Sequence, residues 1–214
     1  MSNINSIKSL HLANQIAQKI NIDDKLKKAF ESIDREYFMP KGFSFYSYSL
    51  EPLPIQAGQW ISSPLTVAKM TKALEYNFAN DSVLEIGCGS GYQAAILSKL
   101  FRRVFTIERI ETLLNEAKER FKKLGIKNIH TRFDDGIKGW KMYAPYDRIL
   151  FSASCIVPPL ALMEQLKDGG ILVAPIEKNG KQVITRYIKD GKRVITQELE
   201  ECFFVPIVEG VQKS

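Results

Sequence analysis

Apolar positions recur at helical spacing at the start of the chain, over residues 6–33. Such spacing places apolar side chains on one face of a helix, and the run 21–24 interrupts it. We therefore expect two short amphipathic helices. Over residues 37–64, prolines, glycines and aromatic residues follow one another without a regular period, which predicts an ordered but irregular segment.

Strand-like and helix-like patterns alternate from residue 65 onward. A helix rich in Val, Ala, Met and Leu comes first, and short apolar runs then alternate with amphipathic stretches. The sequence predicts buried strands at 82–86, 104–107, 129–133 and 148–151, with helices at 92–100, 111–124 and 159–166. This alternation predicts an α/β fold with a mostly parallel central sheet and helices on both faces.

The pattern changes after Gly169-Gly170, where strand-like runs follow one another directly at 171–175, 182–188 and 193–196. Asn179-Gly180 and Asp190-Gly191 separate these runs, and such dipeptides favour tight hairpins. The sheet should therefore finish with antiparallel strands. Because a chain of 214 residues with this hydrophobic content fits one globular domain, we expect a single domain made of an N-terminal part (1–64), an α/β core (65–175) and C-terminal strands (176–214).

The composition is that of a globular domain with a basic surface: 45% of the 214 residues are hydrophobic, and the net charge is +6. Positive charge attracts acidic partners such as RNA or a peptide carboxylate, but Lys and Arg are dispersed, as on an ordinary solvated surface. The three cysteines and two histidines follow no disulfide or metal-ligand spacing, so we expect no bound metal. The first residues show no basic region followed by an apolar stretch, and no apolar run reaches about 18 residues, so we expect a cytoplasmic protein without a membrane partner.

The segment from Val83 to Tyr92 carries the clearest functional signal, because a buried strand there ends in three glycines at alternate positions before a helix. Glycine lets the main chain turn sharply and approach a ligand closely, and the first helical turn offers unpaired N–H donors. In open α/β sheets, ligands bind at the carboxyl ends of strands where the strand order reverses. We therefore expect a small polar ligand across this strand end.

Acidic residues near this turn indicate the ligand. Glu85 precedes a Gly-x-Gly-x-Gly spacing, which differs from the Gly-x-Gly-x-x-Gly of dinucleotide-binding folds. A carboxylate there suits a ligand with an ammonium or sulfonium charge, and S-adenosylmethionine carries both. Glu108, roughly 20 residues later, suits the ribose hydroxyls. One strand further, Asp134-Asp135-Gly136 suits an adenine edge.

Several segments also match a known family. The longest match is Leu84-Glu-Ile-Gly-Cys-Gly-Ser-Gly-Tyr-Gln-Ala-Ala-Ile-Leu97. The others, over about residues 30–208, are Pro54-Ile55, Gly58-Gln-Trp-Ile-Ser-Ser-Pro64, Thr106-Ile-Glu-Arg109, Asp135-Gly136, Ala144-Pro-Tyr-Asp147, Gln165-Leu-Lys-Asp-Gly-Gly170 and Phe204-Val-Pro-Ile-Val208. In this order they resemble the motifs of the protein-L-isoaspartate O-methyltransferases. The chain departs from the family pattern at Trp60, where threonine is usual, and at 151–156, where the family is richer in alanine.

The resemblance implies an S-adenosylmethionine-dependent methyltransferase with a Rossmann-like fold and a modified C-terminal strand order. It also implies a monomeric, cytosolic enzyme that methylates isoaspartyl carboxylates in damaged proteins and so initiates their repair through a succinimide. By position, Ser62 matches the active-site serine. The positions that contact the cofactor match Ile61, Ser62, Glu85, Gly87, Cys88, Gly89, Glu108, Asp135 and Gly136.

The expected chemistry assigns Ser62 a non-covalent role. An isoaspartyl carboxylate is ionised at neutral pH, since carboxyl pKa values lie near about 4. Transfer then needs alignment rather than a strong base, and we expect the Ser62 hydroxyl to donate a hydrogen bond that orients the carboxylate or organises the sulfonium end. No Gly-x-Ser-x-Gly motif surrounds Ser62, which argues against a serine hydrolase. Alternatively, Ser62 is the N-cap of a helix that begins near Pro64.

Two other functions stay open at the level of sequence. The same fold and cofactor serve methylation of RNA or another acceptor, which the basic charge favours. Against nucleic acid, no stripe of Arg and Lys with interleaved aromatic residues occurs. The second is a non-catalytic cofactor-binding module, against which the joint presence of the Ser62 loop and the glycine motif argues.

Overall fold

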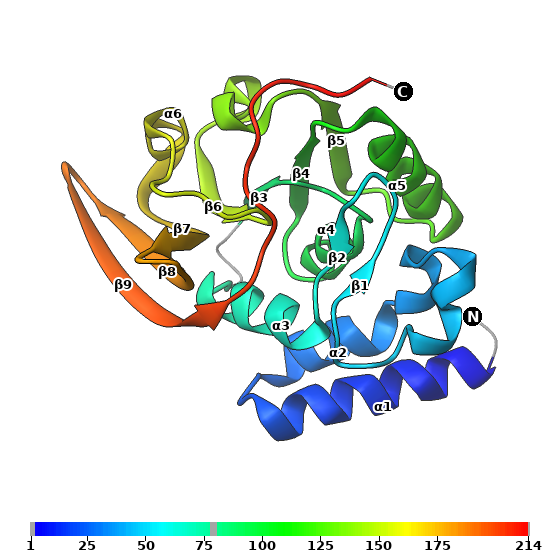
Figure 1. Ribbon diagram of the computed structural model, residues 1–214. Helices are drawn as coiled ribbons and strands as arrows, with labels where there is room; N and C mark the ends of the chain where they lie inside the picture. Colours follow the sequence, from blue (N-terminus) through cyan, green and yellow to red (C-terminus); the bar gives the residue numbers. More distant parts are fainter. Residues whose placement is uncertain (1–2, 78–80, 214) are drawn as a thin grey trace.

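The computed structural model describes residues 3–77 and 81–213, which are organised around a large twisted sheet (Figure 1). Within these residues the sheet has seven strands in the order β5-β4-β3-β6-β7-β8-β9. The strands are β3 (Ser82–Ile86), β4 (Arg103–Glu108), β5 (Ile129–Phe133), β6 (Tyr146–Phe151), β7 (Leu166–Lys178), β8 (Lys181–Asp190) and β9 (Arg193–Cys202). Pairs from β5 to β7 are parallel, and β8 pairs antiparallel with both neighbours. The predicted fold class and antiparallel finish are confirmed.

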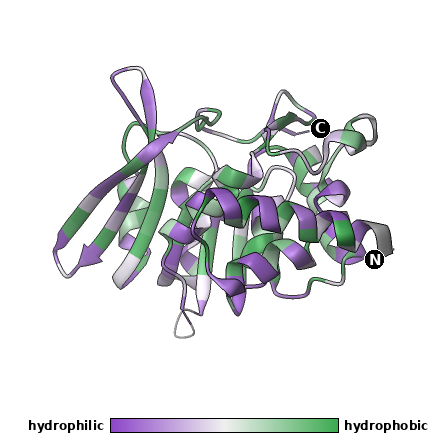
Figure 2. Ribbon diagram, turned by 90° about the horizontal axis from the view of Figure 1, so that it is seen from below, coloured by the Kyte–Doolittle hydropathy of each residue, from purple (hydrophilic) through white to green (hydrophobic). Residues whose placement is uncertain are grey.

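Helices cover both faces of the sheet, but unequally. The helices are α1 (Asn3–Lys19), α2 (Asp24–Ser32), α3 (Pro64–Ala73), α4 (Tyr92–Leu97), α5 (Glu111–Lys123) and α6 (Leu160–Glu164). Successive strand residues point to opposite faces. Val83 and Val104 pack in a core with residues of α1 to α5, whereas Leu84 and Phe105 pack on the other face with Leu162 of α6. Figure 2 shows β8 and β9 extending beyond the helical layers.

No helix among the described residues is long and apolar enough to cross a membrane.

The N-terminal part forms the helices and the irregular segment that the sequence predicts. Asp23 lies in the predicted break and caps α2, because its side chain accepts a hydrogen bond of 2.8 Å from the Leu26 amide. Short 3₁₀ turns at Arg35–Phe38 and Lys41–Tyr46 follow. A small antiparallel pair of strands, β1 (Leu53–Pro54) and β2 (Trp60–Ile61), then leads directly into α3.

Several element boundaries differ from the predictions, and tertiary contacts explain two of them. Helix α4 ends at Leu97 instead of residue 100, where the Asn128 side chain donates hydrogen bonds to the carbonyls of Ser98 and Phe101. Strand β7 begins at Leu166, in the predicted helix 159–166, because Leu166 already pairs with β6. The pairing register then shifts across Gly169-Gly170, as in a β-bulge, so these glycines lie within one strand instead of between a helix and a strand.

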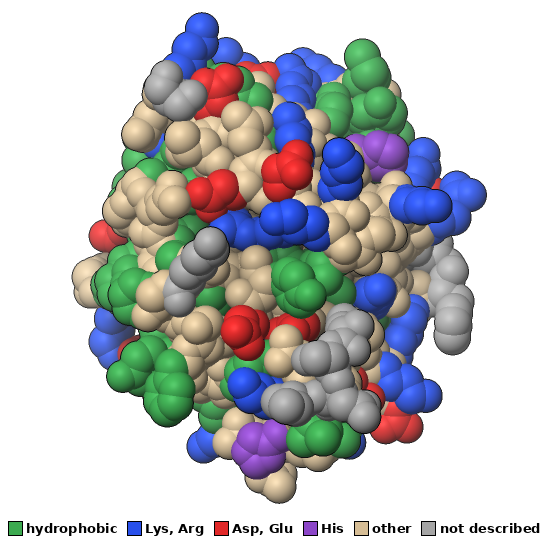
Figure 3. Space-filling model, turned by 90° about the vertical axis from the view of Figure 1, so that its right-hand side faces the viewer, with side chains coloured by type: hydrophobic (Ala, Val, Ile, Leu, Met, Phe, Trp, Pro, Cys, Tyr) green, Lys and Arg blue, Asp and Glu red, His purple; other side chains and the backbone are tan. Residues whose placement is uncertain are grey.

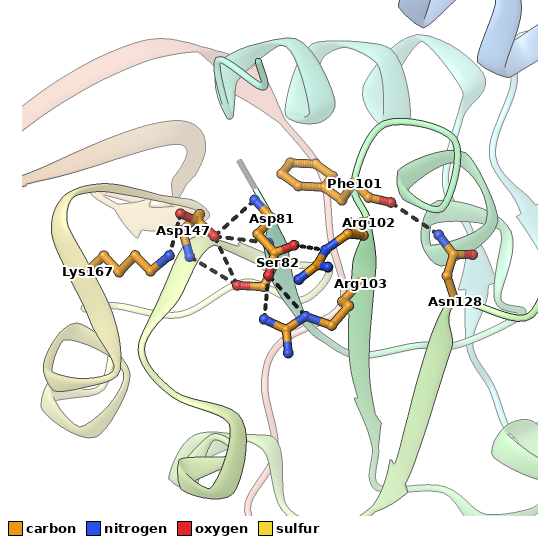
Figure 4. A network of polar contacts seen from close by, with 8 residues as sticks. All are labelled: Asp81, Ser82, Phe101, Arg102, Arg103, Asn128, Asp147 and Lys167. Atoms are coloured by element: carbon orange, nitrogen blue, oxygen red, sulfur yellow. Dashed lines mark hydrogen bonds and ion pairs between the residues drawn. The ribbon is translucent and has the colours of Figure 1, made fainter. Parts of the chain in front are cut away.

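A polar network joins the amino ends of β3 and β6, at the edge of the sheet opposite the glycine turn (Figure 4). The Asp147 carboxylate accepts hydrogen bonds from the Ser82 amide at 2.9 Å and from the Lys167 ammonium at 2.8 Å. Burial raises the pKa of Asp147, but its hydrogen bonds from Lys167, Ser82 and Asp81 together lower that pKa below its ordinary value. This network contributes to the stability of the sheet and lies away from the glycine turn.

Candidate active site

The glycine turn after β3 has a backbone that requires glycine. Gly87, Gly89 and Gly91 have φ angles of +91°, +53° and +90°, a backbone region that residues with a Cβ rarely adopt. A Cβ at Gly91 would also lie 2.8 Å from the Phe121 ring. The Gly87 amide donates a 2.9 Å hydrogen bond to the carbonyl of Ile107, which ties the turn to the end of β4. The turn is therefore held in place before α4 begins.

This turn borders a cleft at the carboxyl ends of β3, β4 and β6, where the strand order reverses. The space amounts to about 910 Å³, part of it open to solvent. The residues expected at the site that line the cleft are Ile61, Ser62, Glu85, Gly87, Cys88, Gly89, Glu108 and Gly136. Burial raises the pKa of the Cys88 thiol well above its ordinary value, so that Cys88 is a neutral packing residue.

Glu85 is a fully buried carboxylate at the end of β3. One of its oxygens accepts a 2.6 Å hydrogen bond from the Thr106 hydroxyl, and the other accepts a 3.3 Å bond from the Ser152 hydroxyl. Burial and, to a smaller extent, the neighbouring Glu108 raise the pKa of Glu85 to about 8, against the effect of these two hydroxyls. A cation in the cleft would favour the ionised form, so the site is suited to a positively charged ligand group.

Glu108 lies at the end of β4, and the glycine turn orients its carboxylate. The Gly89 amide donates to one oxygen at 2.7 Å and the Ile110 amide donates to the other at 3.0 Å. Burial raises the pKa of Glu108, while these backbone hydrogen bonds oppose the rise. Each carboxylate oxygen keeps a second lone pair, so the side chain can still accept hydrogen bonds from two ligand hydroxyls in the cleft.

Ser62 follows β2 and borders the cleft. Its carbonyl accepts a 3.1 Å hydrogen bond from Arg35, while its hydroxyl makes no hydrogen bond to another described residue. The capping interpretation of Ser62 is wrong, because Ser63 is the N-cap of α3 and accepts a hydrogen bond from the Leu65 amide. The Ser62 hydroxyl is therefore available to a bound molecule.

The acidic turn after β5 contributes a glycine to the cleft. Gly136 lines the cleft, and a Cβ there would lie 2.5 Å from the Ile86 side chain. Asp135 does not line the cleft; its carboxylate accepts hydrogen bonds from the Ile137 and Gly210 amides at 3.0 and 2.9 Å. Asp135 thus holds the C-terminal segment in place, and its contact with an adenine stays a prediction.

The sequence predictions missed two parts of the cleft wall. Ser152 follows β6, and its amide donates a 2.8 Å hydrogen bond to the Ile86 carbonyl. The C-terminal segment 205–208 crosses the strand ends (Figure 1), fastened where the Ser154 amide donates a 2.8 Å hydrogen bond to Val205. The segment 205–208 lies in a family motif, and Ser152 lies in the stretch 151–156 where the chain departs from the family, but neither carries an acid or a glycine pattern that would indicate a ligand. Trp60, at the rim, is 54% exposed.

The amino-acid sequence of the chain is similar to those of known enzymes. The family model described as protein-L-isoaspartate(D-aspartate) O-methyltransferase matches residues 6–212. A protein-L-isoaspartate O-methyltransferase of Helicobacter pylori (strain J99) is 56% identical over 210 residues, which cover 98% of this chain and 100% of that protein. The enzyme of the same name from Maricaulis maris is 46% identical, and the match covers 90% of each chain.

Solved structures agree with the sequence comparisons. A protein-L-isoaspartate O-methyltransferase structure superposes with a TM-score of 0.86 at 26% identity, covering 94% of this chain and 66% of that chain. A putative enzyme of this kind from Plasmodium falciparum, in complex with S-adenosyl-L-homocysteine, has a TM-score of 0.82 at 22% identity and shares the fold over 94% of this chain and 98% of its own.

Proposed function

Because the chain belongs to the protein-L-isoaspartate(D-aspartate) O-methyltransferase family, we propose that its cleft transfers a methyl group from S-adenosylmethionine to isoaspartyl carboxylates in damaged proteins. The observation that supports this site is convergence: Glu85, Glu108 and Ser62 come from three separate elements and border one cleft at the point where the strand order reverses.

The side chains and backbone of the cleft fit the methyl donor. S-adenosylmethionine supplies an electrophilic methyl group on a positively charged sulfur, and it also carries an ammonium group and two ribose hydroxyls. Glu85, with a pKa raised to about 8 by burial, is stabilised in its ionised form by a nearby cation. Glu108 has lone pairs for the hydroxyls, and Gly87 and Gly89 let the main chain approach closely.

Ser62 is the residue that we assign to the acceptor. Its hydroxyl donates a hydrogen bond that orients the isoaspartyl carboxylate, which is already ionised because carboxyl pKa values lie near about 4. The protein therefore has no proton to remove, and its contribution is alignment of the reacting groups, a contribution worth up to about 7–11 kcal/mol in favourable systems. Methoxide is a better leaving group than the oxide that a free carboxylate would have to lose. The neighbouring backbone nitrogen therefore attacks the ester carbonyl, loses its proton and displaces methanol, which closes a succinimide whose hydrolysis returns some normal aspartate.

The acceptor is a peptide rather than a nucleic acid in this proposal. On the face shown in Figure 3, Lys and Arg side chains lie among acidic and uncharged ones instead of forming a continuous basic stripe. We further propose that the protein acts as a monomer in the cytoplasm, and light scattering after gel filtration would test its oligomeric state.

Transfer of labelled methyl groups to matched peptides tests the function. The two peptides differ only in isoaspartate versus aspartate, and RNA is the parallel acceptor. We expect label on the isoaspartyl peptide alone, as an ester that base releases. Label on RNA, or cofactor binding without transfer to any acceptor, would contradict the proposal and support one of the two alternative functions.

A further inference from the structure

Arg35 is a buried cation that is bound by main-chain carbonyls instead of a carboxylate. Its side chain is fully buried, and its guanidinium donates four hydrogen bonds, to the carbonyls of Ser47 (2.8 Å), Ser49 (3.2 Å), Glu51 (3.3 Å) and Ser62 (3.1 Å). The adjacent Asp34 carboxylate is used elsewhere, by Asn5 and Tyr48. Burial lowers the pKa of Arg35 to about 10.

A buried charge of this kind carries a desolvation cost. The four hydrogen bonds to main-chain carbonyls offset part of that cost, so Arg35 also contributes to stability. The hydrogen bonds also do something that an apolar side chain cannot do: they connect the segment 47–51 to the backbone of Ser62, which lies 27 residues after Arg35.

The same guanidinium also lies against a second residue that lines the cleft. Its central carbon is 5.6 Å from the centre of the Tyr92 ring, and Tyr92 lines the cleft as the first residue of α4, directly after the glycine turn. The Nε of Arg35 and the hydroxyl of Tyr92 are both buried and have no hydrogen-bond partner among the described residues. Arg35 thus contacts both the backbone of Ser62, which the proposed function assigns to the acceptor, and the ring of Tyr92, which follows the glycine turn.

We propose that Arg35 is a positioning residue for methyl transfer, which holds Ser62 at a set distance from the glycine turn through its forked guanidinium. This inference rests on the proposed function, since it assumes that Ser62 orients the acceptor. Misplacement of a reacting group by about 1 Å can lower a rate about a hundredfold, so a small shift of Ser62 is sufficient to slow the reaction. Arg35 itself touches no reacting atom in this scheme.

Arg148 provides a matched control within the chain. It is also a buried arginine, 6% exposed, whose guanidinium donates to main-chain carbonyls, those of Leu74, Asp147 and Glu75. Burial lowers its pKa as well. Arg148 does not line the cleft and makes no hydrogen bond to a residue that does. The two arginines therefore share their burial and type of bonding, but only Arg35 connects to the site.

The test compares Arg35→Lys with Arg148→Lys, because lysine keeps the positive charge but lacks the planar guanidinium and its several N–H donors. Both should lower the melting temperature. Arg35→Lys should lower kcat on the isoaspartyl peptide by about tenfold to a hundredfold with little change in cofactor Kd, whereas Arg148→Lys should leave kcat within about twofold. Methionine is long and unbranched but carries no charge, so Arg35→Met and Arg148→Met provide a second pair of variants if a lysine variant does not fold.

A double-mutant cycle with Ser62→Ala shows whether Arg35 acts through Ser62. If it does, Arg35→Lys lowers kcat much less in the Ser62→Ala background than in the native protein, because the two effects are not additive. Equal loss of kcat in both backgrounds, or equal effects of the Arg35 and Arg148 variants, would overturn the inference. Native protein that does not methylate the isoaspartyl peptide would instead overturn the proposed function, so the two failures are distinguishable.

Discussion

Replacement of Ser62 by alanine removes a hydroxyl that the fold does not use. The hydroxyl makes no hydrogen bond to another described residue, and the Ser62 carbonyl would keep its 3.1 Å hydrogen bond from Arg35. The backbone should therefore stay where it is, and the free energy of unfolding should change little. In the proposed function, what is lost is one hydrogen bond to the ionised carboxylate of the acceptor.

The magnitude follows from that single bond. A hydrogen bond to a charged group contributes about 1.5–3 kcal/mol, and each 1.36 kcal/mol or so corresponds to a tenfold change in rate. Ser62→Ala should therefore lower kcat on an isoaspartyl peptide by about tenfold to a hundredfold. Cofactor Kd should change much less, because Glu85, Glu108 and the glycine turn stay intact.

Steady-state methyl transfer, cofactor titration and thermal melting measure these three quantities, and the neighbouring serine provides the control. Ser63 caps α3 and donates a 2.6 Å hydrogen bond to the Leu50 carbonyl, so Ser63→Ala should destabilise the protein by about 0.5–2 kcal/mol with kcat nearly unchanged. Native kcat in Ser62→Ala, or equal losses of kcat and cofactor affinity, would refute the role that we assign to Ser62.

Three further predictions follow from the cleft and its surroundings. Since the pKa of Glu85 is raised to about 8, the folded state holds this proton more tightly, and the free energy of unfolding without cofactor should fall as pH rises from about 5 to 8. Glu85→Gln should abolish that fall and weaken cofactor binding about tenfold or more. Melting curves recorded against pH test the first effect, and the same pH dependence in the variant as in the native protein would contradict it. Asp147→Asn should lower the free energy of unfolding by about 1–3 kcal/mol at neutral pH and leave kcat unchanged. The difference between variant and native protein should shrink in acid, as the native Asp147 carboxylate becomes protonated at a pH below its ordinary pKa. Chemical denaturation at two pH values measures this difference. Trp60→Thr should raise the peptide KM by about twofold to tenfold without altering cofactor Kd, as expected for an exposed aromatic at the rim, and an equal change in both constants would count against that placement.

The sequence by itself determined the features that depend on local backbone and on strand order. Alternating strands and helices predict a parallel sheet, and the glycines at 87, 89 and 91 predict a turn with positive φ, because few other residues adopt that conformation. Glu85 and Glu108 end neighbouring parallel strands, so their meeting at one edge follows once the sheet is known. The family motifs add Ser62, which no local pattern distinguishes from Ser63.

Only the tertiary structure decided which residues complete the cleft and which hold it in place. Arg35 binds carbonyls up to 27 residues away, and the segment 205–208 reaches the carboxyl ends of β3 and β6 from the far end of the chain. Periodicity reports which face a side chain occupies, but it does not report which distant segment packs there. For the same reason, the start of β7 at Leu166 depended on a partner remote in sequence, since Leu166 pairs with Tyr146 of β6.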